Sequence, residues 1–360
     1  MLFNELPVRS VTFRNRIVVS PMCQYSSTDG FANDWHFVHL GSRAVGGAAL
    51  VFTEAAAVTP EGRISAQDLG VWKDEHIEFL SRIARFIRQQ GALAGMQIAH
   101  AGRKASTPPP WNGSGTVPSS KGGWTPVAPS ALAFDEKHVA PRALEESEVC
   151  GIVDAFVAAA KRAQQAGFQV LEIHAAHGYL IHEFLSPLTN QRSDRYGGSF
   201  DNRTRLLRDI VMAVRRVWPE GNPLFVRISA NDFAEHGWDL EQSIELTHQL
   251  KRVDVDVIDC SSGGLVPGGF APQRPGYQVP FSSDIRRATG ILTAAVGVIS
   301  EAGMADQIVT RGEADLVLLA REFLRQPYWP FHAAVELGYR VPWPAQYLRA
   351  APADTPIRGS

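Results

Sequence analysis

The chain has 360 residues, of which 45% are hydrophobic and 20% are charged, and its formal net charge at pH 7 is -2. This composition is typical of a globular protein with a large core, and it argues against nucleic-acid binding through a basic surface. No apolar run approaches the roughly 20 residues of a membrane-spanning helix, and the start of the chain lacks the basic and apolar regions of a signal peptide. We therefore expect a cytoplasmic protein with neither a membrane nor a nucleic-acid partner.

The cysteines do not form a recognisable pattern. Cys23, Cys150 and Cys260 lie far apart and are odd in number. Neither a framework of disulfides nor a Cys-x-x-Cys metal site is expected.

The first hundred residues alternate between strand-like and helical patterns. A hairpin closed around Pro7-Val8-Arg9 is predicted over residues 2–14, and a buried strand over residues 15–20 stops at Pro21. The following elements are a helix over 34–47, a strand over 48–54, a helix over 74–90 with Asp74 as its N-cap, and a strand over 92–99. This alternation indicates a parallel sheet covered by helices.

Residues 101–144 form the longest stretch without a regular pattern. The stretch is rich in proline, glycine and serine, and it contains Trp111 and Trp124. Long loops within a compact domain are usually functional. We expect a functional loop here.

The remaining sequence continues the alternation of helix and strand. Helices are predicted over 145–167, 201–218 and 240–252 and from Glu301, and strands over 169–173, 224–229, 255–261, 291–297 and 315–320. Eight strand-helix units in about 330 residues predict an α/β fold, the (β/α)8 or TIM barrel. The hairpin precedes the barrel, and the long loop follows its third strand. We expect one domain over residues 1–349 and a disordered tail over residues 350–360.

Polar side chains gather where the predicted strands end. In a barrel the carboxyl ends of the strands meet at one face, where ligands bind. The side chains at these ends are Cys23, Tyr25, Ala55, Gln97, His100, His174, His177, Arg227 and Arg321. The segment from His174 to Tyr179 offers two histidines and a phenol that could donate hydrogen bonds to one anion. A metal site and a structural capping role for the histidines remain open alternatives.

Two arginines indicate a negatively charged ligand. Gly297, Ala320 and Arg321 follow strands seven and eight, where barrels commonly bind phosphate. Arg227 lies in an apolar strand and needs a negative partner, which could be a structural carboxylate or an electron-rich ligand. Gln97 can bond to the edge of a planar heterocycle, but no Walker A or GxGxxG motif indicates a separate nucleotide domain.

Four separated motifs resemble the old yellow enzyme family, and the Pro-Met-Cys and His-Ala-Ala-His forms resemble its thermophilic-like NADPH dehydrogenase and xenobiotic reductase subgroup. The resemblance covers about residues 2–349. The motifs are Ser20-Pro21-Met22-Cys23-Gln24-Tyr25, Gln97-Ile98-Ala99-His100-Ala101-Gly102-Arg103-Lys104, His174-Ala175-Ala176-His177-Gly178-Tyr179-Leu180 and Asn190-Gln191-Arg192-Ser193-Asp194-Arg195-Tyr196-Gly197-Gly198-Ser199.

The resemblance implies an FMN-dependent ene-reductase on a TIM barrel, with NADPH or NADH as the hydride donor. Cys23 would tune the flavin potential, Arg227 would face N1 and O2 of the ring, and Arg321 would bind the phosphate. The residues implied to hold FMN are Ser20, Pro21, Met22, Cys23, Ala55, Gln97, Arg227, Gly297, Ala320 and Arg321.

The resemblance also implies a ping-pong reaction in which flavin N5 delivers hydride to enones and maleimides, with nitro compounds as a second class of electrophile. His174 and His177 would bind the substrate oxygen, Tyr25 would close over it, and Tyr179 would donate the proton. Arg349 would enter the site of a neighbouring subunit in a homodimer or homotetramer. The rival interpretations are a metal-dependent barrel hydrolase and a non-catalytic FMN-binding protein.

Overall fold

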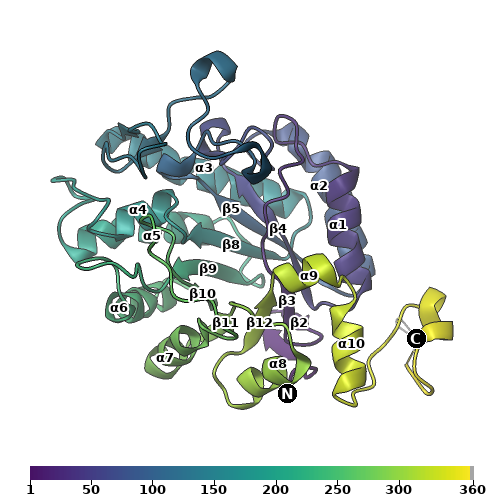
Figure 1. The fold of residues 1–360 in the computed structure, drawn as a ribbon. Coiled ribbons are helices and arrows are strands. Elements are labelled where there is room, and N and C mark those ends of the chain that lie inside the picture. The colour runs from purple at the N-terminus through teal and green to yellow at the C-terminus, as the bar shows by residue number, and fades with distance from the viewer. Residues whose placement is uncertain (357–360) are drawn as a thin grey trace.

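The computed structural model describes residues 1–356, and its centre is a closed barrel of parallel strands (Figure 1). Around the barrel the strands follow the order β10-β11-β12-β3-β4-β5-β8-β9, so each pairs with the next barrel strand in sequence. They are β3 (Ile17–Val19), β4 (Leu50–Ala57), β5 (Leu93–Ala99), β8 (Val170–Ala175), β9 (Leu224–Ser229), β10 (Val257–Ser261), β11 (Leu292–Ala295) and β12 (Leu316–Leu319). The predicted TIM barrel is confirmed.

Helices cover the outside of the barrel, which explains why its strands are apolar on both faces (Figure 1). The longer ones are α1 (Asp34–Val45), α2 (Ile77–Gln89), α3 (Glu146–Gln165), α5 (Phe200–Arg215), α6 (Leu240–Lys251), α7 (Val279–Thr289), α8 (Ala302–Thr310) and α10 (Trp329–Glu336). Two short helices, α4 (Leu180–Leu185) and α9 (Arg321–Arg325), follow β8 and β12. Within residues 1–356, no helix combines the length and apolar character needed to cross a membrane.

The N-terminal hairpin packs against the start of the barrel strands. Its strands β1 (Leu6–Val8) and β2 (Val11–Phe13) pair antiparallel, as predicted. Phe13 is fully buried and stacks against Phe225 at 6.3 Å between ring centroids, and Phe52 meets Phe225 at 5.8 Å. Because Phe52 and Phe225 lie near the first residues of β4 and β9, the hairpin closes this end of the barrel.

The long segment after β5 is irregular, as predicted, and part of it projects beyond the barrel (Figure 1). Its regular pieces are the 3-10 turns η3 (Gly102–Lys104), η4 (Pro110–Asn112) and η5 (Ser119–Lys121) and the paired strands β6 (Val127–Ala128) and β7 (Arg142–Ala143). The other 3-10 turns are η1 (Pro60–Gly62), η2 (Asp74–His76) and η6 (Ala345–Ala350).

Some predicted details are wrong. Asp74 is not an N-cap: it lies inside η2, which has Lys73 at its N-cap, and its carboxylate accepts from Arg162 Nε at 2.7 Å. The first barrel strand is shorter than predicted because the Asn15 side chain bonds to Gly47 O and Ile17 N instead of joining the ladder. Helices α4, α7, α9 and α10 were not predicted.

The proposed tail divides into two parts. Residues 357–360 lie outside the described residues. Ala350 is the last residue of η6 and residues 351–356 follow it, and the Trp343 N–H donates to Pro356 O at 3.0 Å. The division into one domain and a disordered tail stays a prediction.

Candidate functional site

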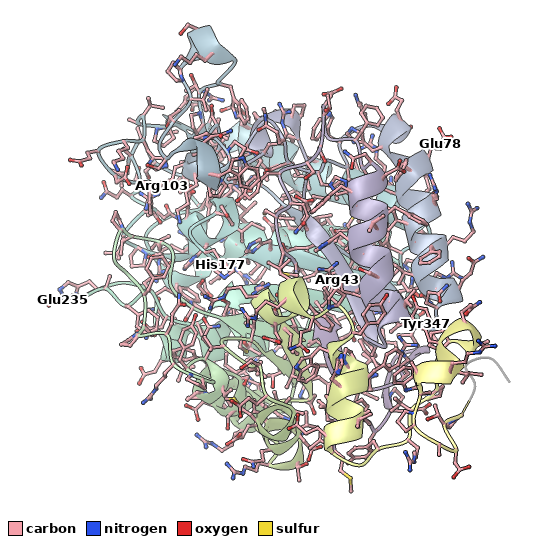
Figure 2. The ribbon with its side chains drawn as sticks, turned by 45° about the vertical axis from the view of Figure 1, so that its right-hand side comes forward. Arg43, Glu78, Arg103, His177, Glu235 and Tyr347 are labelled. Carbon is pink, nitrogen blue, oxygen red and sulfur yellow. The ribbon has the colours of Figure 1, made fainter. Side chains whose placement is uncertain are left out.

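The segment after β8 brings both predicted histidines and the tyrosine together. The ring centroids of His174 and His177 lie 5.0 Å apart, and those of His174 and Tyr179 lie 5.1 Å apart, with each pair close to perpendicular. His177 adopts a positive φ of 60°, and the next residue, Gly178, packs so closely against Gly264 that a Cβ there would collide with the carbonyl oxygen. This turn directs the three rings of the His/Tyr cluster toward one another. Figure 2 labels His177 near the middle of the view, and the residue lies in the turn that follows β8.

Hydrogen bonds and burial determine the protonation state of both imidazoles. His174 Nδ1 accepts from the Ala176 N–H at 3.3 Å, and His177 Nε2 lies 2.7 Å from Ser261 Oγ. Burial, followed by the positive charge of Arg227, lowers the pKa of each histidine well below its usual value. Both rings are therefore neutral at pH 7, and His174 carries its proton on Nε2.

Cys23 and Tyr25 lie on the loop after β3, and this loop is hydrogen-bonded to Glu54 within β4. The Gln24 N–H donates to Glu54 Oε2 at 3.1 Å, and Tyr25 adopts a φ of 51°. Burial and then the charges of Asp68 and Glu54 raise the pKa of the Cys23 thiol well above its usual value. The thiol is therefore protonated at pH 7. The Tyr25 ring meets Trp111 edge-on at 5.5 Å.

Tyr179 is also protonated at neutral pH. Burial is the largest cause that raises the pKa of its phenol well above the usual value, and the Arg227 charge only partly opposes it. Tyr179 and Ala55 line one small cavity together with Asp68. The phenol thus remains an O–H donor beside the His/Tyr cluster.

A cavity of about 380 Å³ lies at the ends of β11 and β12. Its lining includes four predicted cofactor residues: Arg227, Gly297, Ala320 and Arg321. Its volume lies within the range of small-ligand sites, and its two guanidinium groups suit a ligand with negative charge.

Gly297 keeps space free in this cavity. It has a φ of 122°, and a Cβ there would approach Gln278 Nε2 to 2.9 Å. Any other residue at this position would be strained and would push a side chain into the cavity.

The sequence left open whether Arg227 pairs with a structural carboxylate or with a ligand. In the structure Arg227 lies beside a carboxylate and also lines the cavity. Its Nε lies 3.2 Å from Asp259 Oδ2, and its Nη1 donates to Ser20 Oγ at 3.0 Å. Both interpretations of Arg227 are therefore compatible with the geometry.

Gln97 has a polar neighbour, since its Nε2 donates to Glu172 Oε1 at 2.7 Å.

Arg349 lies apart from these residues. It belongs to η6 and lines a cavity with Tyr347 and Trp343 of the C-terminal segment. Figure 2 places Tyr347 at the edge of the molecule, away from His177. Contact of Arg349 with another subunit's site stays a prediction. Among residues 1–356, no group of three or more His, Cys, Asp or Glu side chains is arranged to hold a metal ion.

Several neighbours of the site were not predicted. Ser261 contacts His177, Lys104 Nζ donates to His177 O at 2.9 Å, and Glu172 and Asp259 flank Gln97 and Arg227. A carboxylate within an otherwise apolar strand was the available signal for Glu172 and Asp259. Nothing in the linear sequence pairs Ser261 with His177, because Ser261 ends β10 and His177 lies in the turn after β8.

Comparisons with known proteins agree with this geometry. A model of the family described as NADH:flavin oxidoreductase / NADH oxidase matches residues 1–338. An NADPH dehydrogenase of Geobacillus sp. (strain WCH70) is 46% identical, over 97% of this chain and 98% of that protein. The corresponding NADPH dehydrogenase of Halalkalibacterium halodurans is 48% identical with the same coverage. Among solved structures, morphinone reductase aligns with a TM-score of 0.79 at 26% identity, covering 94% of this chain and 90% of that one.

Proposed function

Since the chain belongs to the NADH:flavin oxidoreductase / NADH oxidase family, and is an FMN-dependent NADPH oxidoreductase of the old yellow enzyme type, we propose that it reduces activated carbon–carbon double bonds. The substrates are enones and maleimides, in which an oxygen withdraws electrons from the double bond, and nitro compounds form a second class. The observation that carries this proposal is the meeting of two neutral histidines and a protonated tyrosine beside Arg227.

The residues at the cavity fit FMN. Arg321 and the space beside Gly297 would hold the phosphate, while Arg227 and Gln97 would meet the ring. Ser20 supports this arrangement because its hydroxyl accepts from Arg227. Pro21, Met22, Cys23, Ala55 and Ala320 complete the proposed binding residues. When bound there, FMN would supply the transfer of hydride between NADPH and the substrate.

The imidazoles would activate the substrate by hydrogen bonding. The Nε2–H of His174 and the ring of His177 bind the carbonyl or nitro oxygen, where negative charge develops as hydride arrives at the β-carbon. A preorganised donor of this kind contributes about 3 kcal/mol to transition-state stabilisation. Neutral histidines suit this role because they donate without carrying a charge that would attract anions indiscriminately.

Tyr179 would supply the proton. Its raised pKa keeps the phenol protonated at pH 7, so the O–H is available for transfer to the α-carbon of the substrate. Tyr25 would close over the substrate from the β3 loop, and Arg227 would stabilise the negative charge of the reduced ring. Cys23 would tune the reduction potential of the flavin through its protonated, polarisable thiol.

An anaerobic titration tests the proposal. The purified protein should show the visible absorbance of bound FMN, lose it on addition of NADPH, and regain it on addition of 2-cyclohexenone. A yellow protein that NADPH does not bleach would indicate a non-catalytic FMN-binding protein. A protein bleached by NADPH but not reoxidised by any enone or maleimide would contradict the proposed substrate class.

A further inference from the structure

Four neighbouring strands of the barrel, β5, β8, β9 and β10, carry the buried polar side chains Gln97, Glu172, Arg227 and Asp259, which we refer to as the charged layer. Gln97 is paired in register with Glu172 across β5 and β8, and Arg227 with Asp259 across β9 and β10. Glu172 and Asp259 are completely buried, and Arg227 is only 6% exposed. The interaction between these groups is therefore weakly screened by water.

The contacts of the charged layer leave several atoms without hydrogen bonds. Glu172 Oε1 accepts from Gln97 Nε2, but Glu172 Oε2 has no hydrogen-bond partner among the described residues. Both carboxylate oxygens of Asp259 also lack one, although Oδ2 lies 3.2 Å from Arg227 Nε. Asp259 thus interacts with Arg227 mainly through charge.

The balance of charge in the layer requires a proton. Two ionised carboxylates beside one guanidinium would leave a buried negative charge without a partner, which is costly. Burial and then repulsion from Asp259 raise the pKa of Glu172 well above its usual value. Burial raises the pKa of Asp259 only to about 6, because Arg227 opposes the effect. Because Asp259 lies 3.2 Å from the Arg227 guanidinium whereas Glu172 is bonded only to the neutral amide of Gln97, the proton belongs to Glu172 and Asp259 is ionised.

We propose that Asp259, as the ionised partner of Arg227, offsets part of that guanidinium's charge and so lowers the reduction potential of bound FMN, whereas Glu172 is a neutral acid that orients the Gln97 amide. The reason is that the reduced ring carries negative charge, which Arg227 stabilises and Asp259 opposes. Both acids are positioning residues that act through Arg227 and Gln97. The inference rests on the proposed function, in which Arg227 and Gln97 meet the ring.

The test compares two neutral isosteres in the FMN-loaded protein. Asp259→Asn should raise the midpoint potential of the flavin and tighten the binding of sulfite, a probe that adds negative charge to the oxidised ring, by about tenfold. Glu172→Gln imitates the protonated acid, so its midpoint potential should match that of the wild type, and its sulfite dissociation constant should stay within about twofold of the wild-type value. Both measurements are independent of turnover.

Matched variants control for changes in the potential that do not come from the Asp259 charge. Asp315→Asn removes another buried carboxylate, which directly precedes β12 and is paired with Arg286 at 2.9 Å, and it should leave the potential unchanged. If Asp259→Asn does not fold, Asp259→Ser removes the same charge with a smaller side chain.

The outcomes separate this inference from the proposed function. An unchanged potential in both Asp259 variants would overturn the role of Asp259, and a Glu172→Gln protein that resembles Asp259→Asn would overturn the division between the two acids. Wild-type protein that binds no FMN would instead contradict the cofactor site itself.

Discussion

The inside of the barrel contains two layers that lie on the same strands and differ in polarity. The layer near the strand starts is apolar and includes Phe52, Phe225 and, from the hairpin, Phe13, all at most 1% exposed. The charged layer above it contains Glu172, Arg227 and Asp259, whose buried atoms include several without hydrogen bonds. Burial is thus equally complete in the two layers, but only the upper one holds chemical groups that a ligand could engage.

The difference separates stability from function along the barrel axis. Apolar contacts in the lower layer stabilise the fold without needing partners. Buried charges in the upper layer cost free energy unless they are paired, and such costs are commonly accepted at functional sites. Substitutions in the two layers should therefore affect different measurements.

The largest effect is expected in the lower layer. Phe225→Ala would leave a cavity between the rings of Phe13 and Phe52 and should lower the free energy of unfolding by about 3–5 kcal/mol. Urea unfolding measures this loss, and Phe233→Ala, at a residue that is 36% exposed, is the matched control. FMN binding by the folded fraction should persist. A destabilisation no greater than that of the control would remove the distinction between the layers.

Substitution in the His/Tyr cluster should slow the reaction and leave the stability of the fold almost unchanged. His177→Ala should weaken binding of a phenol and slow enone-dependent reoxidation about a hundredfold, because a donor to the substrate oxygen is lost. FMN content and unfolding free energy should change little. His236→Ala, at an exposed histidine of the β9–α6 loop, is the control. Loss of FMN from His177→Ala would assign this residue to the cofactor rather than to the substrate.

Within the charged layer, Glu172 predicts a dependence of stability on pH. Its raised pKa means that the folded protein keeps a proton that the unfolded chain releases above the ordinary glutamate pKa of about 4.3. Stability therefore falls as pH rises through this range. Wild type should become progressively less stable relative to Glu172→Gln as the pH rises from about 5 to about 8. Urea unfolding of both proteins measures this; a constant difference would mean that Glu172 is ionised throughout.

The smallest effect is expected outside both layers. Arg349→Ala should lower kcat/KM about fivefold if the side chain reaches the site of a neighbouring subunit, a contribution typical of an exposed charged contact. Arg340→Ala, also exposed and in the same terminal region, should have no effect. Equal kinetics of the two variants in a stable oligomer would remove the proposed role of Arg349.

Much of the fold follows from local patterns. The strands from Leu224 to Ser229 and from Leu93 to Ala99 are recognisable because both faces of a barrel strand are buried, which produces a nearly continuous apolar run. Helix α7 was missed because it begins after the glycine- and proline-rich stretch that follows β10 and carries a proline, Pro280, in its own first turn. The boundary at Asn15 depends on its bond to Gly47, which no local pattern indicates.

The sequence by itself determined the barrel, the clustering of functional residues at strand ends, and the family, because apolar periodicity and compact motifs are local properties. Only the tertiary structure decided the partners of these residues: Asp259 for Arg227, Glu172 for Gln97 and Ser261 for His177. The first two pairs join neighbouring strands and the third joins β10 to the turn after β8, so all three depend on the closure of the barrel. The protonation state of the buried acids depends on the same closure, because the charges that surround a group come from strands distant in sequence.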